Sequence, residues 1–431
     1  MKPSFSEFMA TPHLATLRRI AATLGRQSYL VGGSLRDILL GRAVNDVDVA
    51  VDGGADKLSR CFASECGGTF FPLDKVRGHS RVIFKEVPGT VTFDFAPLKG
   101  PGILEDLALR DFTINALAVP LQGDVELIDP LNGSADICAK QVRRCSEAAF
   151  RDDPLRLVRA FRFAATLGFR IESGTLAAIP AHAPLIANCA GERIRDELFR
   201  ILDMPDAASS FRIMGESGLL SAVFGLLPAR VSSAVEAVGR IQGIVQSNLP
   251  LGAEAAVKVE SRLWQEVQEG ITVLSIMKLA AFLAAAQIAP HGAVERLKLG
   301  KVGGQLVEKL YCAEALPISD HYDAVSAYGL FNGCDPAGLE LPLMLQAFGR
   351  ISELRCGELV DYYQHRHIPR GGTLLLSGAE IMALLSVPPG GIVGEAQELL
   401  RKAQSTGEVR TDAEARAFLG KKLLTTDGPM G

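Results

Sequence analysis

The chain has 431 residues, of which 48% are hydrophobic and 22% charged, and its formal net charge is −4. This balance excludes a disordered or fibrous protein, and it argues against a protein that binds nucleic acid over its whole surface. The length predicts two to four globular domains.

No targeting or membrane segment is evident in the sequence. The N-terminal stretch MKPSFSEFMATPH lacks the apolar core of a signal peptide, and Lys278 interrupts the most apolar region before it reaches membrane-spanning length. The eight cysteines are scattered without a CxxC pair, so they indicate neither a zinc site nor a disulfide framework. We therefore expect a cytoplasmic protein with reduced thiols and no membrane partner.

The chain changes character near residue 135. Before it, short β-rich runs alternate with helical stretches at Pro12 to Leu24 and Ala55 to Cys66; the runs are SYLVGG, DVDVAV, SRVIFKEV, TVTFDFAPL and INALAV. After it, apolar residues recur at helical spacing and strand signals nearly vanish. The sequence predicts an α+β N-terminal domain followed by an all-α remainder.

A glycine pair ends the first predicted strand. Gly32 and Gly33 lie between SYLV and a helix that begins near Ser34, where exposed backbone N–H groups and the helix dipole suit a phosphate. Arg36 could reach the same phosphates, and Asp37 could hold that arginine or simply favour the helix N-terminus. The alternative is a pair required only by the conformation of the turn.

Two aspartates follow on the next predicted strand. Asp46 and Asp48 project from one face because side chains alternate along a strand. Paired carboxylates repel unless a cation lies between them, which suggests divalent metal ions positioned for phosphoryl transfer. Asp94, in the apolar stretch TVTFDFAPL, is a third candidate as base or ligand. A solvated acidic edge strand is the alternative.

The stretch LALRDFTINALAV contains Arg110, Asp111 and Asn115. Asp111 could cap a short helix, or Arg110 and Asn115 could contact a triphosphate. The following Asp129-Pro-Leu-Asn-Gly133 is a strong turn signal and no more.

The stretch RDDPLRLVRAFRFAATLGF carries Arg156, Arg159 and Arg162 at three-residue spacing, which forms a basic ridge on a helix. Asp153 and Pro154 fit an N-cap and a first helical position. Asp153 and Arg156 also offer an acceptor and a forked donor that could read the Watson–Crick edge of cytosine or adenine.

These motifs, taken in order, resemble the class II tRNA nucleotidyltransferase and poly(A) polymerase family. The resembling segments are LVGGSLRD with DVDV, LRDFTINALA, DPLNG, DDPLRLVRAFRFAATLGF and GERIRDEL, and they cover about residues 28 to 200. The resemblance implies a DNA polymerase β-like nucleotidyltransferase head (1–135), a helical neck that selects the nucleobase (136–205), a helical body (206–368) and an RNA-binding helical tail (369–431).

The resemblance also implies the site residues. Asp46 and Asp48 would bind Mg²⁺ in a two-metal site, with Asp94 as the third catalytic carboxylate. The expected nucleotide contacts are Gly32, Gly33, Arg36, Arg110, Asn115, Asp153, Arg156 and Arg159, and the expected RNA contacts are Arg162 and Arg193. The implied reaction is addition of C and/or A to the 3′ end of tRNA from CTP and ATP, without a nucleic-acid template and with release of pyrophosphate.

Three positions depart from the family pattern. Leu109 replaces the first of two arginines, Asp152 replaces a glutamate, and the connection from Asp94 to Arg110 is short. Shortening of this connection is characteristic of members that add only CC, so CC-only addition is an alternative product, as is poly(A) tailing. A catalytically inactive RNA-binding protein is a further alternative, although three retained carboxylates speak against it.

Overall fold

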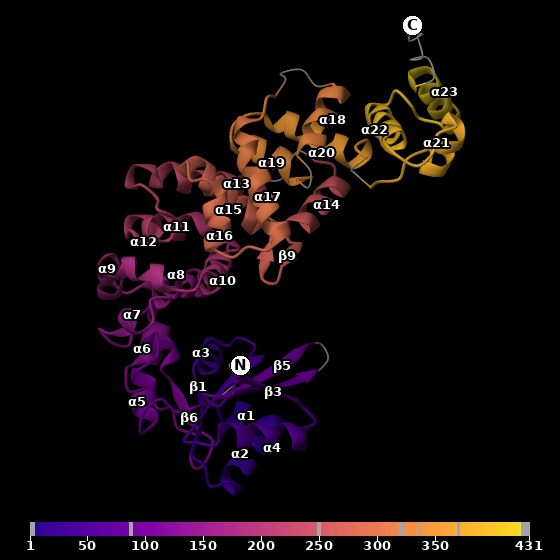
Figure 1. Ribbon diagram of the computed structural model, residues 1–431. Helices are drawn as coiled ribbons and strands as arrows, with labels where there is room; N and C mark the ends of the chain where they lie inside the picture. The colour runs from indigo at the N-terminus through magenta and orange to yellow at the C-terminus, as the bar shows by residue number, and fades with distance from the viewer. Residues whose placement is uncertain are drawn as a thin grey trace. The chain divides into compact units, whose positions relative to one another are not determined.

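The computed structural model describes residues 5–85, 89–247, 251–318, 323–334, 337–368 and 371–423 (Figure 1). Contacts between Cα atoms divide the chain into two compact units, Met1–Cys189 with Ser217–Val223 and Ala190–Glu216 with Phe224–Gly431. The expected first residue of the tail, 369, lies outside the described ranges.

The first unit is built on a mixed six-stranded sheet with strand order β3-β4-β5-β2-β1-β6. Only β2 and β5 run parallel; the other neighbours are antiparallel. The strands are β1 (Ser28–Val31), β2 (Asp46–Val51), β3 (Thr69–Asp74), β4 (His79–Lys85), β5 (Thr90–Pro97) and β6 (Ala118–Pro120). Strands β1, β2 and β5 lie within predicted β-rich runs, and β4 and β6 each overlap one but extend a residue beyond it. The edge strand β3 was missed because Pro72 weakens its strand signal, although a proline is tolerated at a sheet edge.

Helices cover one face of this sheet. They include α1 (Phe5–Met9), α2 (Pro12–Thr23) and α4 (Ala55–Cys66), and Figure 1 shows α2 and α4 together on one side of the strands. Phe62 of α4 packs its ring 4.9 Å from that of Phe93 and 5.4 Å from that of Phe84. Burial of these rings fixes the register of β4 and β5, because a slip of one residue would expose them.

The rest of the first unit is mainly helical. Its elements are α3 (Gly33–Leu40), α5 (Ile103–Ala108), the 3₁₀ turn η1 (Thr113–Asn115), α6 (Gly133–Cys138), α7 (Ala149–Asp152), α8 (Arg156–Leu167), α9 (Ser173–His182), the 3₁₀ helix η2 (Ala183–Asn188) and most of α12 (Leu219–Phe224). Strands β7 (Gln141–Val142) and β8 (Arg170–Ile171) pair in parallel over two residues, a small exception to the predicted helical remainder.

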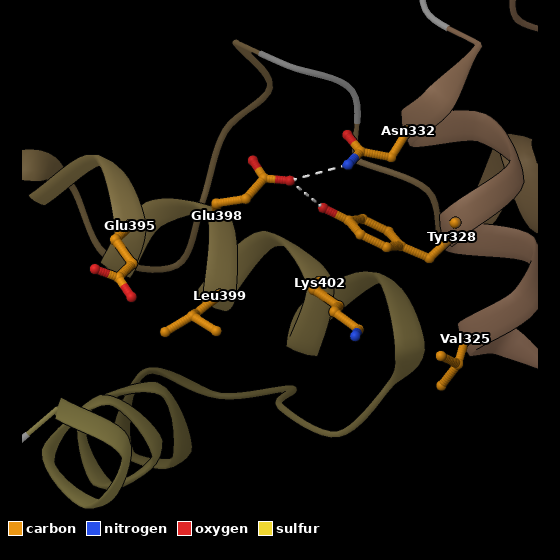
Figure 2. Close-up of a pocket in the computed structure, with 8 residues that line it drawn as sticks. Val325, Tyr328, Asn332, Glu395, Glu398, Leu399 and Lys402 are labelled. Carbon is orange, nitrogen blue, oxygen red and sulfur yellow. Dashed lines mark hydrogen bonds between the residues drawn. The ribbon is translucent and has the colours of Figure 1, made fainter. Parts of the chain in front are cut away.

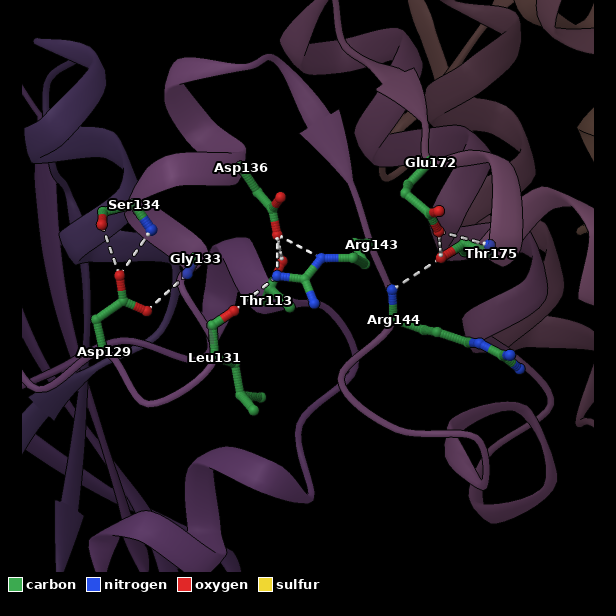
Figure 3. A network of polar contacts seen from close by, with 10 residues as sticks. All are labelled: Thr113, Asp129, Leu131, Gly133, Ser134, Asp136, Arg143, Arg144, Glu172 and Thr175. Atoms are coloured by element: carbon green, nitrogen blue, oxygen red, sulfur yellow. Dashed lines mark hydrogen bonds and ion pairs between the residues drawn. The ribbon is translucent and has the colours of Figure 1, made fainter.

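A polar network joins the Asp129 turn to the strand and helices that follow it (Figure 3). The Asp129 carboxylate accepts hydrogen bonds from the backbone N–H groups of Gly133 and Ser134 at 2.6 and 2.9 Å. The Asp136 carboxylate accepts from the Thr113 hydroxyl at 2.5 Å and from Arg143 Nε at 2.9 Å. The predicted turn is confirmed, and it also caps α6.

The second unit is almost entirely helical in the residues described. Before the C-terminal helices it contains α10 (Gly191–Leu202), α11 (Ala207–Glu216), η3 (Pro228–Arg230), α13 (Val231–Gln246), α14 (Ala253–Leu263), α15 (Val273–Ala286), α16 (Pro290–Arg296), α17 (Lys301–Tyr311), η4 (Cys312–Ala315), α18 (Ala324–Gly333), α19 (Glu340–Ala347) and α20 (Glu353–His365). The unpredicted strands β9 (Glu266–Gln268) and β10 (Ile271–Thr272) form a small hairpin. Helix α15 is buried along nearly its whole length, which explains its apolar sequence.

The C-terminal helices α21 (Gly378–Leu385), α22 (Gly391–Thr406) and α23 (Asp412–Leu423) share a hydrophobic core of their own. Glu398 of α22 links them to α18, because its carboxylate accepts from the Tyr328 hydroxyl at 2.7 Å and from Asn332 Nδ2 at 3.2 Å. These residues line a pocket between the two helices (Figure 2). No helix within the described ranges is long and apolar enough to cross a membrane.

Candidate active site

The glycine turn adopts the geometry that a close ligand requires. Gly32 has a φ of +77°, and α3 begins at the next residue. A Cβ added at Gly32 would lie 3.0 Å from Arg110 Nη1 and 3.1 Å from Asp48 Oδ2. Gly32 therefore lies beside one predicted carboxylate and one predicted triphosphate ligand, and a side chain at this position would crowd both.

The predicted aspartates lie where the strand pattern placed them. Asp46 and Asp48 are exposed at the start of β2, while Val47 and Val49 between and beyond them are buried. The parallel register pairs Asp48 with Asp94 on β5, which confirms that these two residues are neighbours.

Asp48 is electrostatically strained. Its pKa rises to about 6, mainly because surrounding protein atoms partly dehydrate the carboxylate. The negative charges of Asp94 and Asp46 raise the pKa further, whereas the positive charges of Arg110 and Arg36 lower it. The side chain still has water-accessible surface, so a ligand can reach it. A cation bound between Asp46 and Asp48 would relieve this repulsion, so the donor set fits a hard divalent ion.

Asp94 has a partner that the sequence did not reveal. Arg81, opposite it on β4, donates from Nε and Nη2 to the two carboxylate oxygens at 2.7 and 2.8 Å. Within the described residues no group of three His, Cys, Asp or Glu side chains is arranged to hold a metal ion. The pair Asp46 and Asp48 is therefore the candidate metal centre, and a catalytic role for Asp94 stays a prediction.

Two arginines flank the glycine turn and each is oriented by an acid. Arg36 donates from Nε and Nη2 to Asp37 at 3.0 and 2.9 Å, as predicted. Arg110 donates from Nε and Nη2 to Asp106 Oδ2, both at 3.0 Å. Asp106 belongs to α5, in the short connection after Asp94, and its spacing of four residues from Arg110 is a helical ion-pair signal that the sequence analysis overlooked.

A chain of hydrogen bonds continues from Arg36 to α8. Arg36 Nη1 donates to Asn115 Oδ1 at 2.6 Å, and Asn115 Nδ2 donates to Asp111 Oδ1 at 3.0 Å. Arg159 Nε and Nη2 both donate to Asp111 Oδ2, at 3.0 and 2.7 Å. A cap on a short helix was one of two roles considered for Asp111, but only the 3₁₀ turn η1 follows it, and its carboxylate joins Asn115 to Arg159.

Asp153 and Arg156, the pair expected to read the base edge, form hydrogen bonds with the protein backbone. Asp153 Oδ1 accepts from the Leu155 backbone N–H at 3.1 Å, and α8 begins at Arg156, later than predicted. Arg156 donates to the backbone oxygens of Leu109 at 2.8 Å and Arg110 at 3.2 Å. Base reading by Asp153 and Arg156 stays a prediction.

Phe163 is a residue that the sequence analysis missed. Its buried ring lies 5.3 Å from the Arg36 guanidinium carbon, 5.2 Å from that of Arg159 and 3.6 Å from that of Arg162. Gathering three guanidinium groups on one ring concentrates positive charge beside the glycine turn. Arg193, the other predicted RNA contact, is exposed on α10 in the second unit.

A carboxylate pair on a mixed sheet, beside a glycine turn and fixed arginines, defines a nucleotidyltransferase. Family models agree: the poly A polymerase head domain matches residues 28–143, and the probable RNA and SrmB-binding site of polymerase A matches residues 168–229.

The CC-adding tRNA nucleotidyltransferase of Geobacter sulfurreducens is 48% identical over 98% of both chains. The A-adding tRNA nucleotidyltransferase of Deinococcus radiodurans is 33% identical over 93% of this chain and 96% of that protein. The chain therefore belongs to the tRNA nucleotidyltransferase and poly(A) polymerase family.

The fold also matches solved members. The Thermotoga maritima CCA-adding enzyme complexed with tRNA superposes with a TM-score of 0.71 at 24% identity, covering 97% of each chain. The predicted α+β head with a helical remainder is thereby confirmed. Because the similar proteins carry CC-adding, A-adding and CCA-adding names, the comparisons do not favour the alternative of CC-only addition.

Proposed function

We propose that this enzyme adds C and/or A nucleotides to the 3′ end of tRNA, using CTP and ATP and no nucleic-acid template. The observation that carries this proposal is the placement of Gly32 against both Asp48 and Arg110, which brings a phosphate turn and a carboxylate pair together. The names of the similar proteins, which add C or A residues to tRNA, supply the substrate class.

The metal is proposed to be Mg²⁺, held by Asp46 and Asp48. Carboxylate oxygens are the ligands that this ion prefers, and the ion also binds substrate phosphates. When bound it would supply positive charge for the phosphoryl oxygens and lower the pKa of an attacking hydroxyl. Asp94 would lie at the side where that hydroxyl enters.

The remaining predicted residues would bind and orient the substrates. The backbone N–H group of Gly33, with Arg36, Arg110 and Asn115, would hold the triphosphate as pyrophosphate leaves. Gly32 would leave room for the phosphates because it lacks a side chain; its own N–H donates to the backbone oxygen of Leu117 at 3.2 Å. The 3′-hydroxyl of the RNA attacks the α-phosphorus, the bond to the β-phosphate oxygen breaks, and the hydroxyl proton passes to a base or to water. Asp153, Arg156 and Arg159 would select the nucleobase from α8.

The parts of the chain would divide this work. We assign nucleotidyl transfer to residues 1–135, base selection to 136–205, and RNA binding to the helical body (206–368) and tail (369–431). Arg162 and Arg193 are the proposed RNA contacts, acting on the phosphate backbone, which carries most of the affinity in such interfaces.

The proposal is tested with tRNA transcripts that end at the discriminator base, at C and at CC, supplied with CTP and ATP separately and together. We expect extension of at least one transcript by C or A, with no product from UTP or GTP. Product lengths separate CCA, CC-only and A-only addition, and continued growth on unrelated RNA would indicate poly(A) tailing. No extension of any transcript would overturn the proposal.

The variant Asp46→Ala is the matched negative control. We expect incorporation to fall below detection while the variant still binds tRNA, because the exposed Asp46 contributes charge to the metal centre and little to packing. Turnover like that of the wild type would contradict the metal assignment.

A further inference from the structure

The two sides of the carboxylate pair differ. On the side of β1, Gly32 and Arg110 lie beside Asp48, and this is where the leaving phosphates would bind. On the side of β5, Asp94 lies beside Asp48. In-line displacement requires the attacking and leaving oxygens on opposite sides of the phosphorus. The acceptor RNA must therefore approach across β5 and the strands beyond it.

A cross-strand row of side chains leads away from the site in this direction. Asp48 is paired with Asp94, Asp94 with Arg81, and Arg81 with Phe71 on the edge strand β3. Residues directly opposite each other share a face of the sheet, so Phe71 lies on the face that carries the carboxylates. Four strands spaced about 4.8 Å apart put Phe71 about 14 Å from Asp48.

Phe71 is exposed to solvent although it is aromatic. Its exposed fraction is 43%, and its neighbour Leu73 is 53% exposed. Phe70, the preceding residue, points to the other face, where its ring lies 4.0 Å from the Arg60 guanidinium carbon. The strand therefore places one phenylalanine, partly exposed, beside Arg60 of α4 and presents the other on the catalytic face.

The surroundings of Phe71 favour a polyanion. The side chain of Arg81, its cross-strand partner, is 40% exposed while it holds Asp94. Lys75 and Arg77 are exposed in the turn between β3 and β4. An exposed aromatic ring with cations around it is the usual composition of a single-stranded nucleic-acid surface, where bases stack and phosphates meet positive charge.

We propose that Phe71 is a stacking platform for a base near the 3′ end of the acceptor RNA, with Arg81 beside it meeting the backbone. This inference rests on the proposed function and names the surface that seats its second substrate. The distance of about 14 Å from Phe71 to Asp48 suits a base upstream of the terminal nucleotide. Stacking of that base would position the reacting 3′ end and would not depend on which base it is.

The test measures initial rates of C addition while the concentration of an acceptor-stem RNA is varied at saturating CTP. For Phe71→Ala we expect the KM for RNA to rise about tenfold, the usual effect of losing one stacked base. The KM for CTP is expected to stay unchanged. Phe71→Tyr should retain the wild-type KM for RNA because its ring still stacks, and Phe71→Leu should behave like Phe71→Ala.

The matched control is Phe70→Ala, which removes the adjacent ring from the opposite face. We expect its KM for RNA to stay within about twofold of wild type, and melting curves of each variant will show whether the fold is retained. An unchanged KM for RNA in Phe71→Ala, or an equal rise in Phe70→Ala, would overturn the platform. If the wild-type protein extends no RNA at all, the proposed function itself fails.

Discussion

At the scale of single residues, Asp111 connects two parts of the candidate site. The residue is 8% exposed, and its carboxylate accepts hydrogen bonds from Asn115, Arg159 and the Phe112 backbone N–H. Burial alone would raise its pKa, but the charge of Arg159 and these hydrogen bonds lower it below the ordinary value of 3.8. Asp111 thus holds Asn115, and through it Arg36, in a fixed place relative to α8.

We predict that Asp111→Asn lowers the free energy of unfolding by about 3 kcal/mol at pH 7, because it breaks a buried ion pair. A carboxyl group whose pKa is lower in the folded protein stabilises the fold at pH values above its pKa in the unfolded chain. This contribution is lost as the pH falls through its pKa in the folded protein. The difference in the free energy of unfolding between wild type and variant should therefore be largest at pH 7 and decrease below pH 3.8. Urea unfolding followed by circular dichroism measures it, and equal midpoints at pH 7 would contradict the argument.

Gly133 is a second residue whose identity is fixed by its surroundings. A Cβ at this position would overlap the backbone oxygen of Thr113, next to the turn that carries Asn115. We predict that Gly133→Ala destabilises the protein by about 3 kcal/mol or more, through overpacking and displaced backbone. The control is Gly243→Ala on α13, where no atom lies within 4 Å of the added Cβ and alanine favours the helix. Thermal melting should separate the two variants, and similar melting temperatures would contradict the prediction.

Several residue roles could be predicted from the sequence because they depend on near neighbours. The alternation of DVDV placed Asp46 and Asp48 on one face, and the spacing in GSLRD placed Asp37 beside Arg36. The partnership of Arg81 with Asp94 could not be predicted, since it depends on the register of two strands. The apolar alternation of β4 and β5 decides which side chains share a face, but it does not say that these two strands become neighbours or which residues then lie opposite each other.

At the scale of elements, strong periodicity was reliable and short strands were not. Helices α2, α3 and α4 and strand β2 lie where the sequence placed them. The two-residue strands β7 and β8 were missed because so short a segment shows no alternation, and their pairing is set by tertiary contacts. Helix α8 begins after the expected Asp153 cap because Pro154 and Leu155 form a turn first.

Lys278 is the exception in the apolar helix α15, and its contacts explain why it is tolerated. It is 2% exposed, and Nζ donates to the backbone oxygens of Leu202 at 2.6 Å and Met204 at 2.9 Å. These carbonyls lie at the end of α10, where helical partners are lacking. Burial lowers the pKa of Lys278 to about 8, against the opposing charges of Asp203 and Asp206.

The lowered pKa of Lys278 predicts that the stability of the protein depends on pH. Between pH 8 and 10.5 the unfolded lysine is protonated and the folded one is largely neutral, so the unfolded state binds more protons and the contribution to stability rises with pH. The free energy of unfolding should rise by about 3 kcal/mol in total over this pH range. Urea unfolding of wild type and Lys278→Met across this range will measure it, because the variant lacks the titrating group. Parallel pH profiles for the two proteins would contradict the assignment.

At the scale of the whole molecule, the candidate catalytic residues all lie in the first unit, whereas the proposed RNA contacts extend into the second. The net charge of −4 means that RNA must be held by local groups of cations and not by a general attraction. The C-terminal helices α21 to α23 share a separate core, so charge on their surface can be changed without disturbing the fold of the first unit.

Three lysines on the C-terminal helices are exposed: Lys402 on α22 and Lys421 and Lys422 on α23. Because the tail is expected to bind RNA, changing all three to Glu should raise the KM for full-length tRNA several-fold and reduce its dependence on salt, since phosphate contacts release counterions. The KM for CTP should stay the same, because its proposed contacts all lie in the first unit. The KM for an acceptor-stem RNA should change less than that for tRNA, because its proposed contacts lie outside the tail. Lys57→Glu on the exposed surface of α4 serves as the control for added negative charge. An equal effect of the triple variant on both RNA substrates would place the RNA-binding surface of the tail in doubt, and no effect on tRNA would exclude these lysines from it.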